Sequence, residues 1–165
     1  MIVHVANIDM LNGVASDVTD EQKAIMSKLW PGPITFVLRR NPNVPDVTTG
    51  GLDTVAVRWP SRREAAEIIE AAGVPIAAPS ANLSGKPSPT TFEDVAEDMD
   101  GRIDAIVKGE RTAIGIESTV LDLTSEVPTI LRPGFITKSQ IEEAVDGEVQ
   151  YDPSLFKKPG ADDFH

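Results

Sequence analysis

The stretch TVAVRWPSRREAAEIIEAAGVPIAA, residues 54–78, combines the local signals of two strands with those of a helix between them. Its alternating valines indicate a strand, and the alanines and isoleucines that follow recur at helical spacing. Ser61 and Glu64 form a capping-box pattern before the helix, and Gly73 stands where a helix commonly ends. Residues 74–78 then predict a second, shorter strand. Such a strand–helix–strand unit favours an α/β domain.

The same alternation of strands and helices continues on both sides of this unit. Thr19 with Gln22, and Thr137 with Gln140, form capping boxes before two further helices. The remaining predicted elements are strands at 2–6, 34–38, 103–107, 118–123 and 128–131, a helix at 91–99 and a loop at 41–51.

Length and composition bound the domain organisation. The chain has 165 residues, 15 Lys and Arg against 26 Asp and Glu, a formal net charge of −11 and no cysteine. We predict one α/β domain over residues 1–147, with a mixed twisted sheet flanked by helices on both faces, and an extension or linker over residues 148–165. No segment approaches the roughly 20 apolar residues of a membrane span, so a cytoplasmic location is expected.

The composition also excludes several kinds of site. Without cysteine the chain has no thiolate nucleophile and no Cys-ligated metal, and its two histidines, His4 and His165, exclude a multi-histidine metal centre. The acidity argues against a broad nucleic-acid-binding face, but a small anionic ligand needs only a few cations and backbone N–H groups. The sequence has no Walker A, GxGxxG or GxSxG motif.

Four segments place polar side chains at predicted strand ends, where ligands bind in open α/β sheets. PSANLSGKPSPT, residues 79–90, offers small polar groups to phosphate or carboxylate oxygens; the alternative is a proline-stiffened surface loop. Arg58 can hold an anion in a bidentate fork, or can pair with an acid at a sheet edge. The hydroxyls of residues 117–119 can point into a cleft, or can satisfy nearby backbone groups. Arg132 follows a strand and precedes a Pro-Gly turn, and alone it is a weak signal. His4, inside an apolar strand, is more typical of a hydrogen-bonded core residue.

Six segments in order resemble the YrdC-type threonylcarbamoyl-AMP synthases. They are IVHVAN, LWPGPITFVL, VAVRWP, PIAAPSANLSGKPSPT, GIESTVLDL and ILRPG, and the resemblance runs from residue 2 to about residue 145. It implies a YrdC-like three-layer fold and the conversion of L-threonine, bicarbonate and ATP, with Mg²⁺, into L-threonylcarbamoyl-AMP and pyrophosphate. It also implies that threonylcarbamoyl-transferase proteins use this product to modify adenosine in tRNA, and it leaves direct tRNA binding open.

The resemblance also assigns residues to the two sides of a cleft. Arg58 suits the L-threonine carboxylate and the backbone carbonyl of Ala78 suits its ammonium, while Arg132 suits a phosphate. The resemblance implies no covalent nucleophile, no acid or base and no metal ligand among these residues. The L-threonine side has His4, Arg58, Ala78 and Ser118, and the nucleotide side has Thr54, Ser80, Asn82, Ser88 and Arg132.

The sequence departs from the family pattern at both ends. Family members carry a segment with a K-x-R motif ahead of the IVHV strand, and this sequence begins at that strand. Because those two cations are expected on the ATP phosphates, we expect an N-terminally truncated fold that turns over little substrate. KKPGADDFH at the other end resembles the linker to a second domain. The alternatives are a non-catalytic RNA-binding or regulatory module of the same fold, and an unrelated α/β ligand-binding domain.

Overall fold

The computed structural model describes residues 1–79, 91–108 and 117–156 of the chain. The chain divides into two compact units. The first unit comprises Met1–Ala77 and Glu117–His165, and the second comprises Ala78–Ile116.

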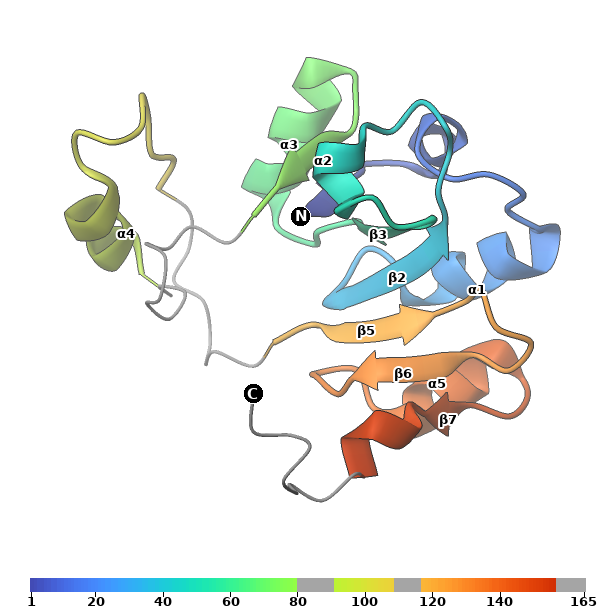
Figure 1. The fold of residues 1–165 in the computed structure, drawn as a ribbon. Helices are drawn as coiled ribbons and strands as arrows, with labels where there is room; N and C mark the ends of the chain where they lie inside the picture. The colour runs from blue at the N-terminus through green and yellow to red at the C-terminus, as the bar shows by residue number, and fades with distance from the viewer. Residues whose placement is uncertain (80–90, 109–116, 157–165) are drawn as a thin grey trace, which may run out of the picture. The chain divides into compact units, whose positions relative to one another are not determined.

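The first unit is built on a seven-stranded sheet in the order β4-β1-β3-β2-β5-β6-β7 (Figure 1). β1 runs parallel to β3, and β2 runs antiparallel to β3 but parallel to β5. β6 runs antiparallel to β5 and parallel to β7, so the predicted mixed sheet of an α/β fold is confirmed. The strands are β1 (Ile2–His4), β2 (Ile34–Arg39), β3 (Thr54–Arg58), β4 (Ile76–Ala78), β5 (Thr119–Asp122), β6 (Thr129–Arg132) and β7 (Gln150–Tyr151).

Helices α1 and α5 pack side by side on one face of this sheet (Figure 1). The Lys28 ammonium of α1 donates to the carbonyl of Ala144 on α5, at 3.1 Å. Within the described residues, no helix is long and apolar enough to cross a membrane. The helical elements are η1 (Ile8–Gly13), α1 (Asp20–Leu29), α2 (Asp46–Thr49), α3 (Arg63–Ala72), α5 (Lys138–Val145) and η2 (Pro153–Phe156) in the first unit, and α4 (Phe92–Met99) in the second.

The two faces of the sheet differ in burial. On the face toward α1 and α5, Phe36 and Val57 are fully buried and belong to the main core. Side chains alternate between the two faces along a strand, so the neighbours of Val57 point the other way. Those neighbours, Ala56 and Arg58, are only half-buried. At β3 the sheet therefore has one closed apolar face and one half-open face, and on the half-open face Thr35 of the neighbouring strand β2 is buried.

Most of the local predictions are confirmed. Thr19 and Thr137 each cap a helix, and both capping boxes are complete. Gly73 ends α3 at φ 71°, in the left-handed region that favours glycine. The helix predicted at 91–99 forms as α4, one residue later than expected. Each of these signals acts within a few residues of the chain and needs no distant partner.

The predicted capping box before α3 is wrong. Ser61 and Glu64 do not cap the helix together, because α3 begins at Arg63 and its N-cap residue is Arg62. No side chain caps this N-terminus. The helix thus starts one residue later than the sequence pattern requires, which moves Glu64 from the third to the second helical position.

Two further segments differ from the predictions. Residues 103–107 form no strand, and Ile103 and Val107 are 48% and 62% exposed, since β-branched composition alone does not supply a pairing partner. The predicted loop at 41–51 contains the short helix α2.

Candidate functional site

One row of paired residues crosses the half-open face of the sheet, and we call it the cross-strand row. Its successive members are His4 on β1, Arg58 on β3, Thr35 on β2, Val120 on β5 and Arg132 on β6. Directly paired residues share one face of a sheet, and these side chains form a line roughly 19 Å long. The strand register shifts beside the Val120–Arg132 pair, and the 3.3 Å contact of Arg132 Nη2 with the Ser118 hydroxyl places Arg132 on this face. Ser118 lies two residues before Val120 and points to the same face. The fold thus brings together four residues that the sequence predicted for ligand binding.

An aromatic cluster fixes the end of β3 that carries Arg58. Trp59 follows Arg58 directly and packs edge-on against Trp30, with ring centroids 6.4 Å apart. Trp30 in turn meets Phe36 of β2 at 4.8 Å. The amide of Val5 donates to the Arg58 carbonyl at 2.9 Å, which ties the same point to the chain beyond β1. The backbone of Arg58 is therefore held from both neighbouring strands.

The Arg58 side chain is a cation without a carboxylate partner among the described residues. Its Nε is buried and has no hydrogen-bond partner there. Burial, and next the positive charge of Arg132, lower the pKa of Arg58 from its usual value. A guanidinium nevertheless stays charged in proteins, so a bound anion would supply the hydrogen-bond acceptor that Arg58 lacks among the described residues. This feature points most strongly to a ligand site within the row.

Residues Glu117, Ser118 and Thr119 are clamped between two neighbouring segments. The amide of Thr119 donates to the Pro33 carbonyl at 3.1 Å, and the Thr119 hydroxyl donates to the Ile136 carbonyl at 2.7 Å. A Cβ on Gly134 would lie 2.5 Å from the Thr119 nitrogen and 2.6 Å from the Ser118 carbonyl carbon. The glycine of the R-P-G segment is thus required because its backbone passes directly against the segment that presents Ser118.

Replacing Gly134 with alanine is expected to destabilise the first unit by about 2–3 kcal/mol, since backbone atoms must move to admit the methyl group. Urea unfolding measures this change. Gly13→Ala is the matched control, because a Cβ at Gly13 meets nothing within 4 Å. Equal stability of the two variants would contradict the clamped arrangement.

The edge of the Arg132 guanidinium that carries Nε and Nη2 is hydrogen-bonded to Ser118 in the same segment. Its Nη2 donates to the Ser118 carbonyl at 2.8 Å and lies 3.3 Å from the Ser118 hydroxyl, while its Nε donates to that carbonyl at 3.3 Å. Nε also lies 3.5 Å from a carboxylate oxygen of Glu117. The other terminal nitrogen, Nη1, has no hydrogen bond to the described residues, so this edge is available to an anion.

His4 lies at the other end of the row. Burial, and next the charge of Arg58, lower its pKa below the ordinary value of about 6.5. Contacts with the backbone at Ile76 and Ile2 act in the opposite direction and are outweighed. The Ile2 carbonyl lies 3.1 Å from Nδ1. A proton on Nδ1 would leave Nε2 as a hydrogen-bond acceptor.

The lowered pKa of His4 predicts a pH dependence of stability. The unfolded chain binds a proton at His4 near pH 6.5, whereas the folded chain binds it only at lower pH, so the contribution is present above pH 6.5 and is lost as pH falls through the folded pKa. Urea unfolding between about pH 5.5 and 7.5 is expected to show this decline, with a slope below ~1.4 kcal/mol per pH unit. His4→Gln should flatten the profile over that range. An unchanged profile in this variant would contradict the assignment.

The remaining predicted site residues do not join the row in the described structure. Thr54 shares the face of Arg58 but lies at the opposite end of β3, paired with Arg39. Ala78 is the last residue of β4 and the first residue of the second unit. Ser80, Asn82 and Ser88 lie outside the described residues. Thr35 was missed, because within the apolar run ITFVL it has the pattern of a buried β-branched core residue.

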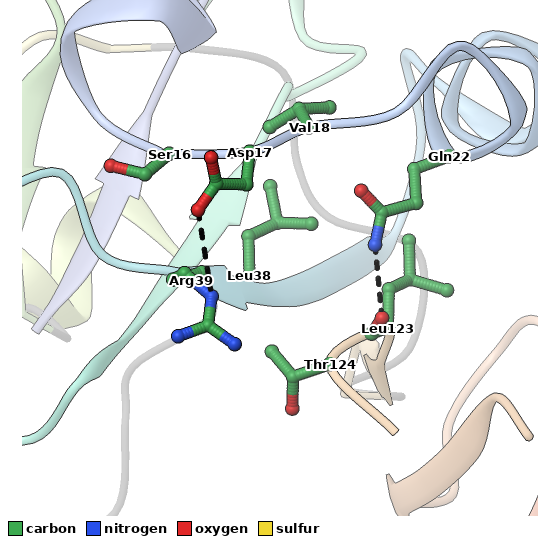
Figure 2. A pocket seen from close by; sticks show the side chains of 8 residues that line it. All are labelled: Ser16, Asp17, Val18, Gln22, Leu38, Arg39, Leu123 and Thr124. Atoms are coloured by element: carbon green, nitrogen blue, oxygen red, sulfur yellow. Dashed lines mark hydrogen bonds and ion pairs between the residues drawn. The ribbon is translucent and has the colours of Figure 1, made fainter. Parts of the chain in front are cut away.

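A pocket of about 240 Å³ lies at the other end of β2 (Figure 2). Arg39 faces Asp17 there at 3.9 Å, and both side chains are largely exposed. Gln22 reaches across the pocket and donates to the Leu123 carbonyl at 3.0 Å. The polar groups drawn in this pocket thus have partners or contact solvent, unlike Arg58. Among the described residues, no group of three His, Asp or Glu side chains could hold a metal ion.

Comparison with known proteins gives consistent matches. The Sua5_yciO_yrdC family, described as "Telomere recombination", matches residues 1–134. The threonylcarbamoyl-AMP synthase of Pyrococcus abyssi is 47% identical over 158 residues, covering 96% of this chain and 46% of that protein. The synthase of Bacillus subtilis is 50% identical over 157 residues, covering 94% of this chain and 45% of that protein. The chain spans about half the length of the curated relatives it matches.

Solved structures agree with this assignment. The crystal structure of P. abyssi Sua5 complexed with L-threonine matches with a TM-score of 0.87 and 47% identity, covering 97% of this chain and 47% of that one. E. coli YciO matches with a TM-score of 0.71 and 25% identity, covering 81% of this chain and 65% of that one.

Proposed function

Since this chain belongs to the Sua5/YciO/YrdC family, we propose that it binds L-threonine and a nucleotide on the half-open face of its sheet and acts in threonylcarbamoyl-AMP synthesis. The proposed reaction joins L-threonine, bicarbonate and ATP into L-threonylcarbamoyl-AMP and releases pyrophosphate. Its product would then be used by threonylcarbamoyl-transferase proteins on tRNA, and a cytoplasmic location remains a prediction.

The observation that carries this proposal is the Arg58 guanidinium, whose buried Nε has no partner among the described residues. An amino acid supplies the missing partner, because its carboxylate accepts two parallel N–H bonds from an arginine. His4 pairs with Arg58 in the row, and its lowered pKa disfavours a second positive charge against the ammonium. L-threonine is chosen because it is the ligand of the related P. abyssi structure.

Arg132 would bind the phosphate groups of the nucleotide. Its fixed edge on Ser118 leaves Nη1 for a phosphate oxygen, roughly three strand spacings from Arg58. The predicted roles of Thr54, Ser80, Asn82 and Ser88 on the nucleotide, and of the Ala78 carbonyl on the ammonium, stay predictions. In this arrangement the two arginines would hold the two substrates at neighbouring places on one face.

The chemistry needs positioning and charge stabilisation rather than a nucleophilic side chain. The L-threonine ammonium loses one proton, and bicarbonate takes up a proton and loses water to give CO₂. The free nitrogen attacks the CO₂ carbon and loses its second proton, and the resulting carbamate oxygen displaces pyrophosphate from the α-phosphorus of ATP. Arg132 would stabilise the negative charge that develops on the phosphate oxygens. The described residues offer no carboxylate set for Mg²⁺, so we assign no protein ligand to the ion that accompanies ATP.

Thermal unfolding with ligands tests the proposal. L-threonine at about 100 times its Kd is expected to stabilise the chain by about 2.7 kcal/mol, which raises Tm by several degrees. L-Threonine should raise Tm and D-threonine should not, and pyrophosphate release should require L-threonine, bicarbonate and ATP together. Stabilisation by tRNA with no response to L-threonine would instead favour the RNA-binding alternative.

A further inference from the structure

Thr35 is the buried polar residue at the centre of the cross-strand row, between Arg58 on β3 and Val120 on β5. Only 1% of Thr35 is exposed. Its Oγ1 lies 3.4 Å from the Ser118 hydroxyl, its one side-chain hydrogen-bond partner among the described residues. A buried hydroxyl with no partner is costly, so this pairing is the arrangement that satisfies Thr35.

The Ser118 hydroxyl has one proton to donate and two lone pairs to accept with. Nη2 of Arg132 lies 3.3 Å from this oxygen and can only donate, so it occupies one lone pair. Donation from Thr35 would occupy the second lone pair. The Ser118 proton would then have no acceptor within this cluster and would be free for a ligand oxygen.

We propose that Thr35 is a positioning residue whose hydroxyl donates a hydrogen bond to the Ser118 hydroxyl. The Ser118 proton is then left to form a hydrogen bond with bound L-threonine. The inference rests on the proposed function for the identity of the ligand. Thr35 itself is buried and acts only through Ser118. In the opposite arrangement, with Ser118 donating to Thr35, the serine could offer the ligand no proton at all.

Thr35→Val tests this inference because valine keeps the β-branched shape and loses only the hydroxyl. Isothermal titration is expected to show an L-threonine Kd about tenfold higher in this variant. Thr35→Ser restores the hydroxyl and should recover most of the affinity. Thr129→Val is the matched control, since Thr129 is also a buried strand threonine, but its hydroxyl donates to the Val127 carbonyl at the far end of β6. A wild-type Kd in Thr35→Val, or the same loss in Thr129→Val, would overturn the inference.

A double-mutant cycle shows whether Thr35 acts through Ser118. In a Ser118→Ala background, Thr35→Val should change the Kd for L-threonine by less than about twofold, because the group that Thr35 orients is gone. Independent tenfold losses in both backgrounds would overturn the inference. A merely structural contribution of Thr35 would not depend on the residue at 118 in this way.

A measurement on the ligand-free protein tests this inference independently of the proposed function. If the wild-type chain does not bind L-threonine, the proposed function fails, and the hydroxyl pair is then tested through the NMR signal of the Arg132 Nη2 protons. Nη2 lies 3.3 Å from the Ser118 hydroxyl, so Thr35→Val should shift this signal and Thr129→Val should not. An unshifted signal in Thr35→Val would overturn the inference without reference to any ligand.

Discussion

Replacing Arg58 with leucine is expected to abolish L-threonine binding while leaving the fold as stable as the wild type or more stable. Loss of a bidentate carboxylate contact in a partly buried site should weaken binding at least 100-fold, which is about 3 kcal/mol. Without a ligand, however, Arg58 is a desolvated cation with no carboxylate among the described residues, and its removal relieves that cost. A stability gain of about 1 kcal/mol is expected from urea unfolding.

The opposite directions of these two effects make the prediction specific. A residue that merely supports the fold loses binding and stability together when it is replaced. Arg63→Leu is the matched control, because it removes the same charge from an exposed position on α3, where Arg63 lies 3.7 Å from Glu67. It should leave the affinity for L-threonine unchanged. A marked fall in stability of Arg58→Leu, or retained binding, would show that Arg58 is a structural residue.

Arg132→Leu is expected to weaken ATP binding by more than about 100-fold. Two causes act together. The phosphate loses the guanidinium that would stabilise its charge, and Ser118 loses the donor that lies against its carbonyl and its hydroxyl. L-threonine affinity should therefore fall as well, by about tenfold, although Arg132 is not placed on that substrate.

Lysine at this position separates the two causes. Arg132→Lys keeps the positive charge but cannot make the forked contact with Ser118, so it should recover part of the ATP affinity and little of the L-threonine affinity. Fluorescence titration with an ATP analogue and isothermal titration with L-threonine provide the two readouts. Arg63→Leu again serves as the charge control. Full recovery of both affinities by lysine would contradict the role given to the contact with Ser118.

Local signals allowed much of the fold to be predicted. The capping boxes at Thr19 and Thr137 and the helix end at Gly73 depend on residues within one turn, and all three form as expected. Predictions that depended on distant contacts were less secure. Residues 103–107 have the composition of a strand but no strand partner in the described structure. The capping pattern at Ser61 was offset by one residue from the true start of α3.

The candidate site shows the same difference between features set by local sequence and features set by distant contacts. Arg58, Ser118 and Arg132 could be selected from the sequence because each is a polar group at a strand end. Their arrangement in one row depends on the pairing of β3 with β2 and of β2 with β5, which no local pattern specifies. Thr35 was missed for this reason. In the run ITFVL it reads as one more buried β-branched residue, and only the strand register sets it beside Ser118.

NMR titration of the chain with L-threonine tests whether this amino acid binds at the cross-strand row. We predict saturable shifts of the Arg58 and Arg132 Nε–H signals and of the Ser118 amide. The signals of Arg39 and Thr124, in the pocket of Figure 2 at the other end of β2, should stay unchanged. Saturable shifts confined to that pocket, or the absence of any saturable shift, would show that L-threonine does not bind at the cross-strand row.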